Sequence, residues 1–311
     1  MSTVEQIVCA LRQTEQCTIF MHHRPDGDTV GSAAALGIAL RRLGKQVQYA
    51  CSDEITPRYA PLVGGEAHFD EPCGTLIAVD IAAPDMGGRF SEYVQRADIV
   101  IDHHGSNKGY GKLNLICPEA AAAGEIVYEV VKALTTVDLE IAQALYTAIS
   151  TDTGCFRHGS TTANTHRVAA DLMETGLDIT ALNRKLFSIK TRAALMMGSK
   201  LLDTLTLYNE GRVAVLFVTK SMIAECGATE DDMENIAAVG MQIEGVHTAA
   251  TLRELAENEY KVSVRSDGSV NAAKICAHFG GGGHPMAAGC TLRGTLDECK
   301  EQMARVMGEE L

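Results

Sequence analysis

Residues 17–44 read CTIFMHHRPDGDTVGSAAALGIALRRLG and contain an apolar run, a polar loop and a helical stretch in succession. The apolar residues 17–21 predict a β-strand. The stretch 31–44 predicts a helix in which Ser32 caps the start and Gly44 follows the last turn. Further apolar runs, alternating with helical stretches, occur at 46–51, 75–81, 97–102 and 113–117. This alternation predicts an α/β fold with a parallel sheet that has helices on both faces.

The rest of the chain predicts a second, smaller α/β domain after a run of helices. Amphipathic stretches predict helices at 120–134, 138–150, 164–175, 178–187 and 187–205. Strands are expected at 212–220, 245–255 and 260–268, followed by helices at 271–279 and 295–311. We therefore predict a first domain over 1–187, a connecting helix over 188–208 and a second domain over 209–311.

Composition indicates a folded protein whose net negative charge opposes binding of long polyanions. Of its 311 residues, 46% are hydrophobic and 22% are charged, which is ordinary globular usage. The 40 acidic and 27 basic residues give a net charge of −13, so long duplex nucleic acid is not an expected partner. The ten cysteines form no C-x-x-C pair, and no apolar run is long enough to cross a membrane. A cytoplasmic location without membrane contact is the simplest expectation.

Carboxylates and histidines follow the predicted strands at the points where those strands end. Parallel sheets bind ligands outside the carboxyl ends of their strands, so these residues are candidates for one site. A further aspartate follows a predicted helix in a Thr/Gly-rich turn. The set comprises His22, Asp26, Asp28, Asp80, Asp102, His103, His104 and Asp152.

The charge of this set predicts two divalent cations. Four of the aspartates, at positions 26, 28, 80 and 152, would balance two such ions, and His22 and His103 could add imidazole ligands. Mixed carboxylate and imidazole ligands favour Mn²⁺, with Mg²⁺, Co²⁺ or Zn²⁺ as alternatives. Paired metal ions are a recurring device for phosphoester hydrolysis. Each feature alone is also typical of a solvated turn or a helix cap, and only their coincidence favours a site.

Five segments of the chain resemble the motifs of one known family. They are HHRPDGDTVGS, AVDIA, DHHG, STDTGCF and GGGGHPMAAG, in this order. The first four are similar to the motifs of the DHH phosphoesterase superfamily, and the last is similar to its DHHA1 substrate-binding domain. The nearest resemblance is to its NrnA-type members.

The resemblance implies a role for each residue of the first domain. His22, Asp26 and Asp80 would hold one metal ion, and Asp80 would bridge to the other. The second ion would also be held by Asp28, His103 and Asp152. His104 would contact the phosphate and either stabilise the transition state or donate a proton to the leaving oxygen. Asp102 would orient the histidine pair.

In the second domain the resemblance implies the substrate-binding residues. Arg265, at the end of a predicted strand, would clamp a terminal phosphate. Backbone N–H groups of Gly281, Gly282 and Gly283 would cradle a phosphate beside His284, and Asn271 would make a further contact. Without the resemblance, a glycine run is equally typical of a flexible loop or a helix start.

The resemblance also implies the activity. The expected function is metal-dependent hydrolysis of short oligoribonucleotides to mononucleotides and of 3′-phosphoadenosine 5′-phosphate (pAp) to AMP, with two Mn²⁺ per chain. The alternatives are a phosphodiesterase for cyclic di-AMP or linear dinucleotides, and a nucleotide-binding sensor without catalysis. The Met-rich stretch at 195–202 indicates core packing or a homodimer contact.

Overall fold

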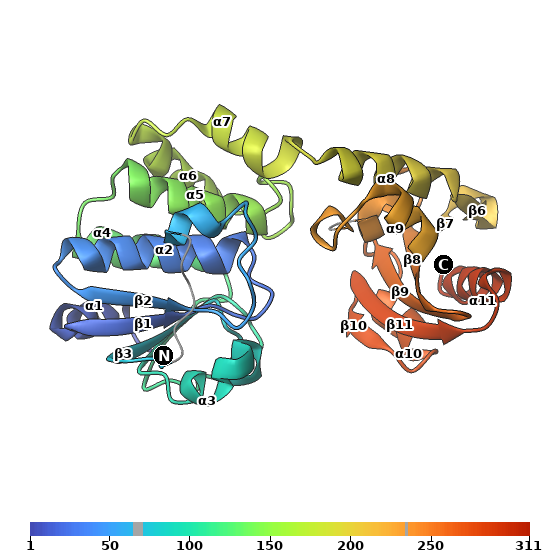
Figure 1. Ribbon diagram of the computed structural model, residues 1–311. Helices are drawn as coiled ribbons and strands as arrows, with labels where there is room; N and C mark the ends of the chain where they lie inside the picture. The colour runs from blue at the N-terminus through green and yellow to red at the C-terminus, as the bar shows by residue number, and fades with distance from the viewer. Residues whose placement is uncertain (65–70, 234–235) are drawn as a thin grey trace. The chain divides into compact units, whose positions relative to one another are not determined.

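The computed structural model describes residues 1–64, 71–233 and 236–311. The chain divides into two compact units, Met1–Ile189 and Lys190–Leu311. We call them the first and second unit and describe each by itself (Figure 1). Both are α/β, so the predicted fold class is confirmed.

The first unit contains a sheet of five parallel strands in the order β2-β1-β3-β4-β5. Each of the five predicted apolar runs overlaps one of these strands. Their bounds are β1 Gln16–Phe20, β2 Gln46–Ala50, β3 Thr75–Val79, β4 Ile99–Asp102 and β5 Leu113–Ile116.

The helices of the first unit pack mainly on one face of this sheet. Ile19, Ile77 and Ile101 lie in one core with helices α1, α2 and α4, and α5 lies on the far side of α2 from the sheet (Figure 1). On the opposite face, Phe20 and Val100 pack against the segment Pro84–Val94, which contains the short helix α3. The bounds are α1 Val4–Gln13, α2 Gly27–Arg42, α3 Ser91–Val94, α4 Ala123–Leu134, α5 Leu139–Asp152, α6 Ala163–Glu174 and α7 Ile179–Asn183.

Helix α2 begins four residues before the predicted start at Gly31, and its cap is Asp26. Oδ1 of Asp26 accepts hydrogen bonds from the backbone N–H groups of Asp28 and Thr29, at 3.0 and 3.1 Å. The prediction that Ser32 caps the helix is wrong, because Ser32 lies inside it and donates to Oδ1 of Asp28 at 3.0 Å. Gly44 does follow the last turn, with a left-handed φ of 79°. With this earlier start, Asp26 and Asp28 lie at the N-terminus of α2, in the loop that follows β1 and in the first turn of the helix.

Helices α2 and α5 approach each other closely at two glycines. A Cβ at Gly31 would lie 2.5 Å from the backbone oxygen of Ala144, and one at Gly27 would lie 2.3 Å from Oγ1 of Thr151. Only glycine fits at such separations. The close packing brings Asp152, the last residue of α5, toward the first turn of α2.

The second unit contains a sheet of six strands in the order β10-β11-β9-β8-β7-β6. Strands β7 and β8 pair in parallel, and the other neighbours are antiparallel. The predicted runs overlap β7, β8 and β9, whereas β6, β10 and β11 were not predicted. The bounds are β6 Thr206–Tyr208, β7 Val213–Val218, β8 Thr248–Ala256, β9 Glu259–Ser266, β10 Gly282–His284 and β11 Ala287–Arg293.

The two faces of this sheet have separate cores. Helices α10 and α11 cover one face, over Val215, Val262 and Cys290. Helices α8 and α9 cover Ala214 and Leu216 on the other face. The bounds are α8 Arg192–Asp203, α9 Lys220–Cys226, α10 Ala272–Ala277 and α11 Leu296–Glu309.

The Met-rich stretch 195–202 lies on α8. Met197 and Leu201 are fully buried in the core, whereas Leu195 and Leu202 are exposed. Core packing therefore explains part of this stretch. None of the described helices is long and apolar enough to cross a membrane, and all ten cysteines are free thiols.

The close packing at Gly31 predicts that replacing glycine with alanine has opposite effects on stability at Gly31 and at Gly198. Gly31→Ala should destabilise the first unit, because overpacking costs about 1–3 kcal/mol and outweighs the gain in helix propensity. Gly198→Ala on α8 should stabilise by about 0.5–1 kcal/mol, because within the described residues no atom beyond the adjoining backbone of α8 lies within 4 Å of an added Cβ. Thermal and urea unfolding of both variants checks this, and a stable Gly31→Ala variant would contradict the packing argument.

Candidate metal centre

The carboxyl ends of three strands of the first unit meet two helix ends at one edge of the sheet. His22, Asp80 and His103 follow β1, β3 and β4, while α2 and α5 contribute their aspartates. Donor atoms of these residues lie within 4.8 Å of one another in three overlapping groups. The groups are His22, Asp26, Asp80; Asp28, His103, Asp152; and Asp80, His103, His104.

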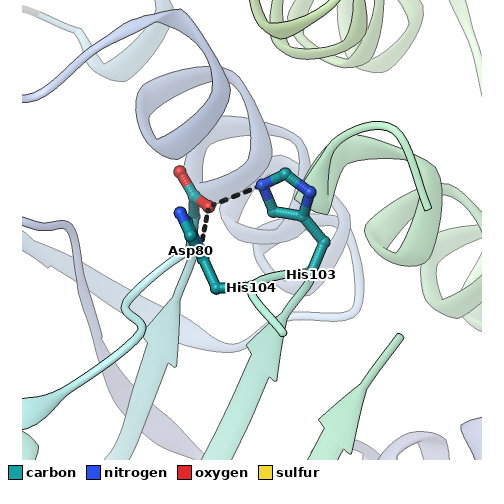
Figure 2. Close-up of side chains that lie close together, drawn as sticks. All are labelled: Asp80, His103 and His104. Atoms are coloured by element: carbon teal, nitrogen blue, oxygen red, sulfur yellow. Dashed lines mark ion pairs between the residues drawn. The ribbon is translucent and has the colours of Figure 1, made fainter. Parts of the chain in front are cut away.

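Asp80 is shared by two of these groups. Its Oδ1 lies 3.5 Å from Nε2 of His103 and 3.5 Å from Nδ1 of His104, as Figure 2 shows, and its Oδ2 lies 3.6 Å from Nε2 of His22. The residue is 2% exposed, and Oδ1 has no hydrogen-bond partner among the described residues. A buried carboxylate oxygen without a partner is costly unless a cation pairs with it. This oxygen is the strongest local indication of a metal site.

The tautomers of His22 and His103 fit metal ligation. Nδ1 of His22 lies 2.7 Å from the backbone oxygen of His23, and Nδ1 of His103 lies 3.2 Å from that of Ala120. Because a carbonyl oxygen only accepts, each Nδ1 carries the proton. Each Nε2 is therefore the ring atom directed at the carboxylates, which is the arrangement of many metal-bound histidines.

The carboxylates of the cluster leave an excess of negative charge that cations would relieve. Nε2 of His103 lies 3.7 Å from Asp28 and 3.6 Å from Asp152. Burial, then the charges of Asp80, Asp152 and Asp26, raise the pKa of Asp28 well above its usual range. Burial and neighbouring carboxylates likewise raise the pKa of Asp152 to about 6, although His103 and His104 lower it. The donor set fits hard divalent cations.

Helix α4 helps to hold Asp28 in this position. The backbone N–H groups of Ala123 and Gly124 donate to Asp28 at 2.7 and 3.0 Å, at the start of α4. Free N–H groups at a helix start stabilise a negative charge. Asp28 can therefore be both buried and ionised when a cation balances its neighbours.

Asp102 holds the ring of His104. Its Oδ1 accepts from Nδ1 of His104 and from the backbone N–H of His103, both at 2.8 Å, and its Oδ2 accepts from Nδ2 of Asn107 at 2.6 Å. The hydrogen bond that His104 donates to Asp102 is the main reason that the pKa of His104 is raised. With Nδ1 bound in this way, Nε2 is the ring atom of His104 left for a ligand.

Two features of this site were not predicted. Asn107 is 5% exposed and fixes Asp102, but its position in a turn after the DHH triplet carried no distinguishing pattern. After Asp152, the residues Gly154, Cys155 and Phe156 all have positive φ, between 55° and 62°. Consecutive left-handed residues are costly and are often found at functional sites.

The glycine run of the second unit forms an edge strand rather than a loop, and the predicted phosphate contact of its backbone N–H groups stays a prediction. Gly282–His284 forms β10 and pairs with β11. A Cβ at Gly281 would lie 2.2 Å from the backbone oxygen of Gly289, and Gly283 has a φ of 147°. These two glycines are needed for the hairpin itself. An added Cβ at Gly282 would meet no atom within 4 Å among the residues that the structure describes.

The other predicted residues of the second unit divide into two groups. Arg265 on β9 and His284 on β10 both pair in register with Ala287 on β11, so they lie on one face of the sheet. Asn271 instead caps α10, where its side-chain oxygen accepts from the N–H of Lys274 at 3.2 Å. This hydrogen bond gives Asn271 a structural role.

Two family models match the chain. The DHH family, N-terminal domain, matches residues 16–149, and the DHHA1 domain matches residues 210–310. The chain is 34% identical to the bifunctional oligoribonuclease and PAP phosphatase NrnA of Thermus thermophilus, over 94% of this chain and 89% of that protein. It is 25% identical to the Bacillus subtilis protein of the same name, over 88% and 89%.

One solved structure shows the same fold over nearly the whole chain. It is an exopolyphosphatase-related protein from Bacteroides fragilis, with a TM-score of 0.85 and 22% identity. The match covers 98% of this chain and 95% of that chain.

The position of Asp80 predicts that its charge is required for metal binding. Asp80→Asn keeps a side chain that tolerates the left-handed φ of 59° but removes the charge. Since loss of an outer partner already costs about 10–100-fold in metal affinity, Mn²⁺ affinity should fall by about 100-fold or more. Calorimetry and electron paramagnetic resonance of Mn²⁺ measure this, with the exposed Asp203→Asn as control. Wild-type affinity in Asp80→Asn would refute the assignment.

Proposed function

The chain belongs to the DHH/DHHA1 family of phosphoesterases, and we propose that it hydrolyses short oligoribonucleotides to mononucleotides and pAp to AMP. The Thermus thermophilus and Bacillus subtilis relatives are named for both activities. The observation that carries the proposal is the carboxylate and histidine cluster around Oδ1 of Asp80, which is buried and has no hydrogen-bond partner among the described residues.

The cluster would hold two divalent cations, and Mn²⁺ is the ion we propose, with Mg²⁺ or Co²⁺ as substitutes. His22, Asp26 and Asp80 would hold one ion, and Asp28, Asp80, His103 and Asp152 the other. Bound there, the ions would supply a nucleophilic water at neutral pH and neutralise charge on the phosphoryl oxygens.

His104 is the proposed proton donor to the leaving oxygen. Asp102 accepts from its Nδ1 at 2.8 Å, which fixes the ring plane and favours the protonated imidazole. Nε2 would then donate to the substrate. Asp102 is buried and also bonded to Asn107, so it acts by positioning His104.

The second unit is proposed to bind the nucleotide, through Arg265 and His284. A guanidinium and an imidazole on one sheet face suit a terminal phosphate. The net charge of −13 supports small anionic substrates over long ones.

The product profile tests the proposal. The purified chain with Mn²⁺ should release AMP from pAp and mononucleotides from RNA of two to five nucleotides, and should leave cyclic di-AMP intact. Chromatography of the products measures this. Preferential opening of cyclic di-AMP would make the chain a signalling phosphodiesterase, and no product from any substrate would make it a sensor.

The proposed role of His104 predicts a loss of turnover with metal retained. His104→Ala should lower kcat by about 10²–10⁴-fold, which is the usual contribution of a general acid, with a small change in KM. The Mn²⁺ content of the variant should equal that of the wild type. The exposed His278→Ala is the matched control. A kcat within threefold of the wild-type value would exclude the role.

A further inference from the structure

The face of the second unit's sheet that α8 and α9 cover over Ala214 is partly accessible further along, on β9 and β11. Burial alternates strictly along both strands: Val262 and Val264 on β9 are buried, while Ser263 and Arg265, which alternate with them, are half-buried. On β11 the same alternation leaves Ala287, Gly289 and Thr291 accessible. Such alternation is typical of a sheet with one face against a core and one toward solvent. We call the accessible side the open face.

The centre of the open face has small side chains and its border has cations. Gly282 on β10, Gly289 on β11 and Ser263 on β9 pair in register, so the centre of the open face carries no side chain larger than that of serine. Lys261 and Arg265 flank Ser263 on β9. In a chain with a net charge of −13, this local grouping favours an anionic ligand.

His247 and Asp267 extend the open face beyond the ends of β8 and β9. Thr248 pairs with Ser266, and the N–H of Asp267 donates to the backbone oxygen of His247 at 3.1 Å, so the ladder continues by one residue pair. Ala249, two residues after His247, pairs with Arg265. Since side chains two residues apart share a face, His247 is a diagonal neighbour of Arg265 on the open face.

The ring of His247 is held in one orientation. Its Nδ1 lies 2.7 Å from Oδ2 of Asp267, and Oδ1 of Asp267 accepts from the backbone N–H and the hydroxyl of Ser269 at 2.8 and 2.6 Å. In the described part of the chain, Nδ1 is the one ring atom of His247 with a recorded hydrogen bond. The side chain is 41% exposed, so Nε2 is available to a ligand.

We propose that His247, held by Asp267, binds an oxygen of the same nucleotide phosphate that Arg265 binds. His247 is then a further substrate-binding residue, and Asp267 is a positioning residue. The proposal rests on the proposed function for the identity of the ligand, a nucleoside monophosphate group. It assigns to this chain a phosphate contact directly before β8, in addition to those proposed on β9 and β10.

Binding of AMP and of adenosine to the full chain tests the proposal. Calorimetry or equilibrium dialysis, without added metal, compares the wild type with His247→Ala, Asp267→Asn and His278→Ala. The last variant removes an exposed imidazole at the end of α10, away from the open face, and is the matched control. Unfolding midpoints of all variants confirm that each is folded.

His247→Ala should weaken AMP binding by about tenfold, as expected for one hydrogen bond to a charged group, and leave adenosine binding unchanged. Asp267→Asn should weaken AMP binding by a smaller factor and raise KM for pAp without lowering kcat. His278→Ala should behave as the wild type. Wild-type AMP affinity in His247→Ala, an equal loss for adenosine, or no AMP binding by the wild type would each overturn the proposal.

The same experiment separates this inference from the proposed function. If the wild type binds AMP through His247 but hydrolyses neither pAp nor short RNA, the proposed function fails and the phosphate contact stands. If hydrolysis occurs and His247→Ala retains the wild-type KM and AMP affinity, the inference alone fails.

Discussion

Mutual repulsion among buried carboxylates is the constraint that organises the first unit. Asp28 and Asp80 are nearly inaccessible to water, and placing two ionised groups there costs several kcal/mol each unless other charges compensate. The chain supplies part of the compensation through the N–H groups at the start of α4 and the imidazoles of His22 and His103. Bound cations would balance the negative charge that these groups leave uncompensated. The glycine contacts between α2 and α5 serve this arrangement, because they set the distance at which Asp152 joins it.

Much of this site could be predicted because strand ends are visible in a sequence. An apolar run that stops at Asp80 or at the DHH triplet identifies both a strand and the edge at which its last side chains lie. The start of α2 was harder, since Asp26 acts as a helix cap and a candidate ligand at once, and a residue with two roles matches neither pattern cleanly. Asn107 and the left-handed run at Gly154–Phe156 depend on tertiary packing that leaves no local periodicity. The glycines before His284 were ambiguous for a related reason, since close backbone approach and ligand access both select glycine.

Both units use the same pairing of a histidine with an aspartate. In each pair the carboxylate accepts from Nδ1 and is itself fixed by another donor, Asn107 for Asp102 and Ser269 for Asp267. The pairs differ in their surroundings. Asp102 is fully buried beside the metal cluster, while Asp267 is exposed at the end of a strand. The buried pair suits proton transfer, and the exposed pair suits binding of an ion that arrives from water.

The left-handed backbone of Asp80 restricts how this position can vary during evolution. Asparagine and glycine accept that conformation but carry no charge, whereas glutamate keeps the charge but has a longer side chain that rarely adopts the conformation. Every single replacement therefore gives up either the geometry or the charge. No replacement at this position keeps both the backbone conformation and the negative charge. A lineage that loses Asp80 would therefore lose the metal-binding carboxylate in one step. In a lineage that becomes non-catalytic with this fold, the residue at position 80 would then change in a single step. Residues on the surface of the second unit would change gradually.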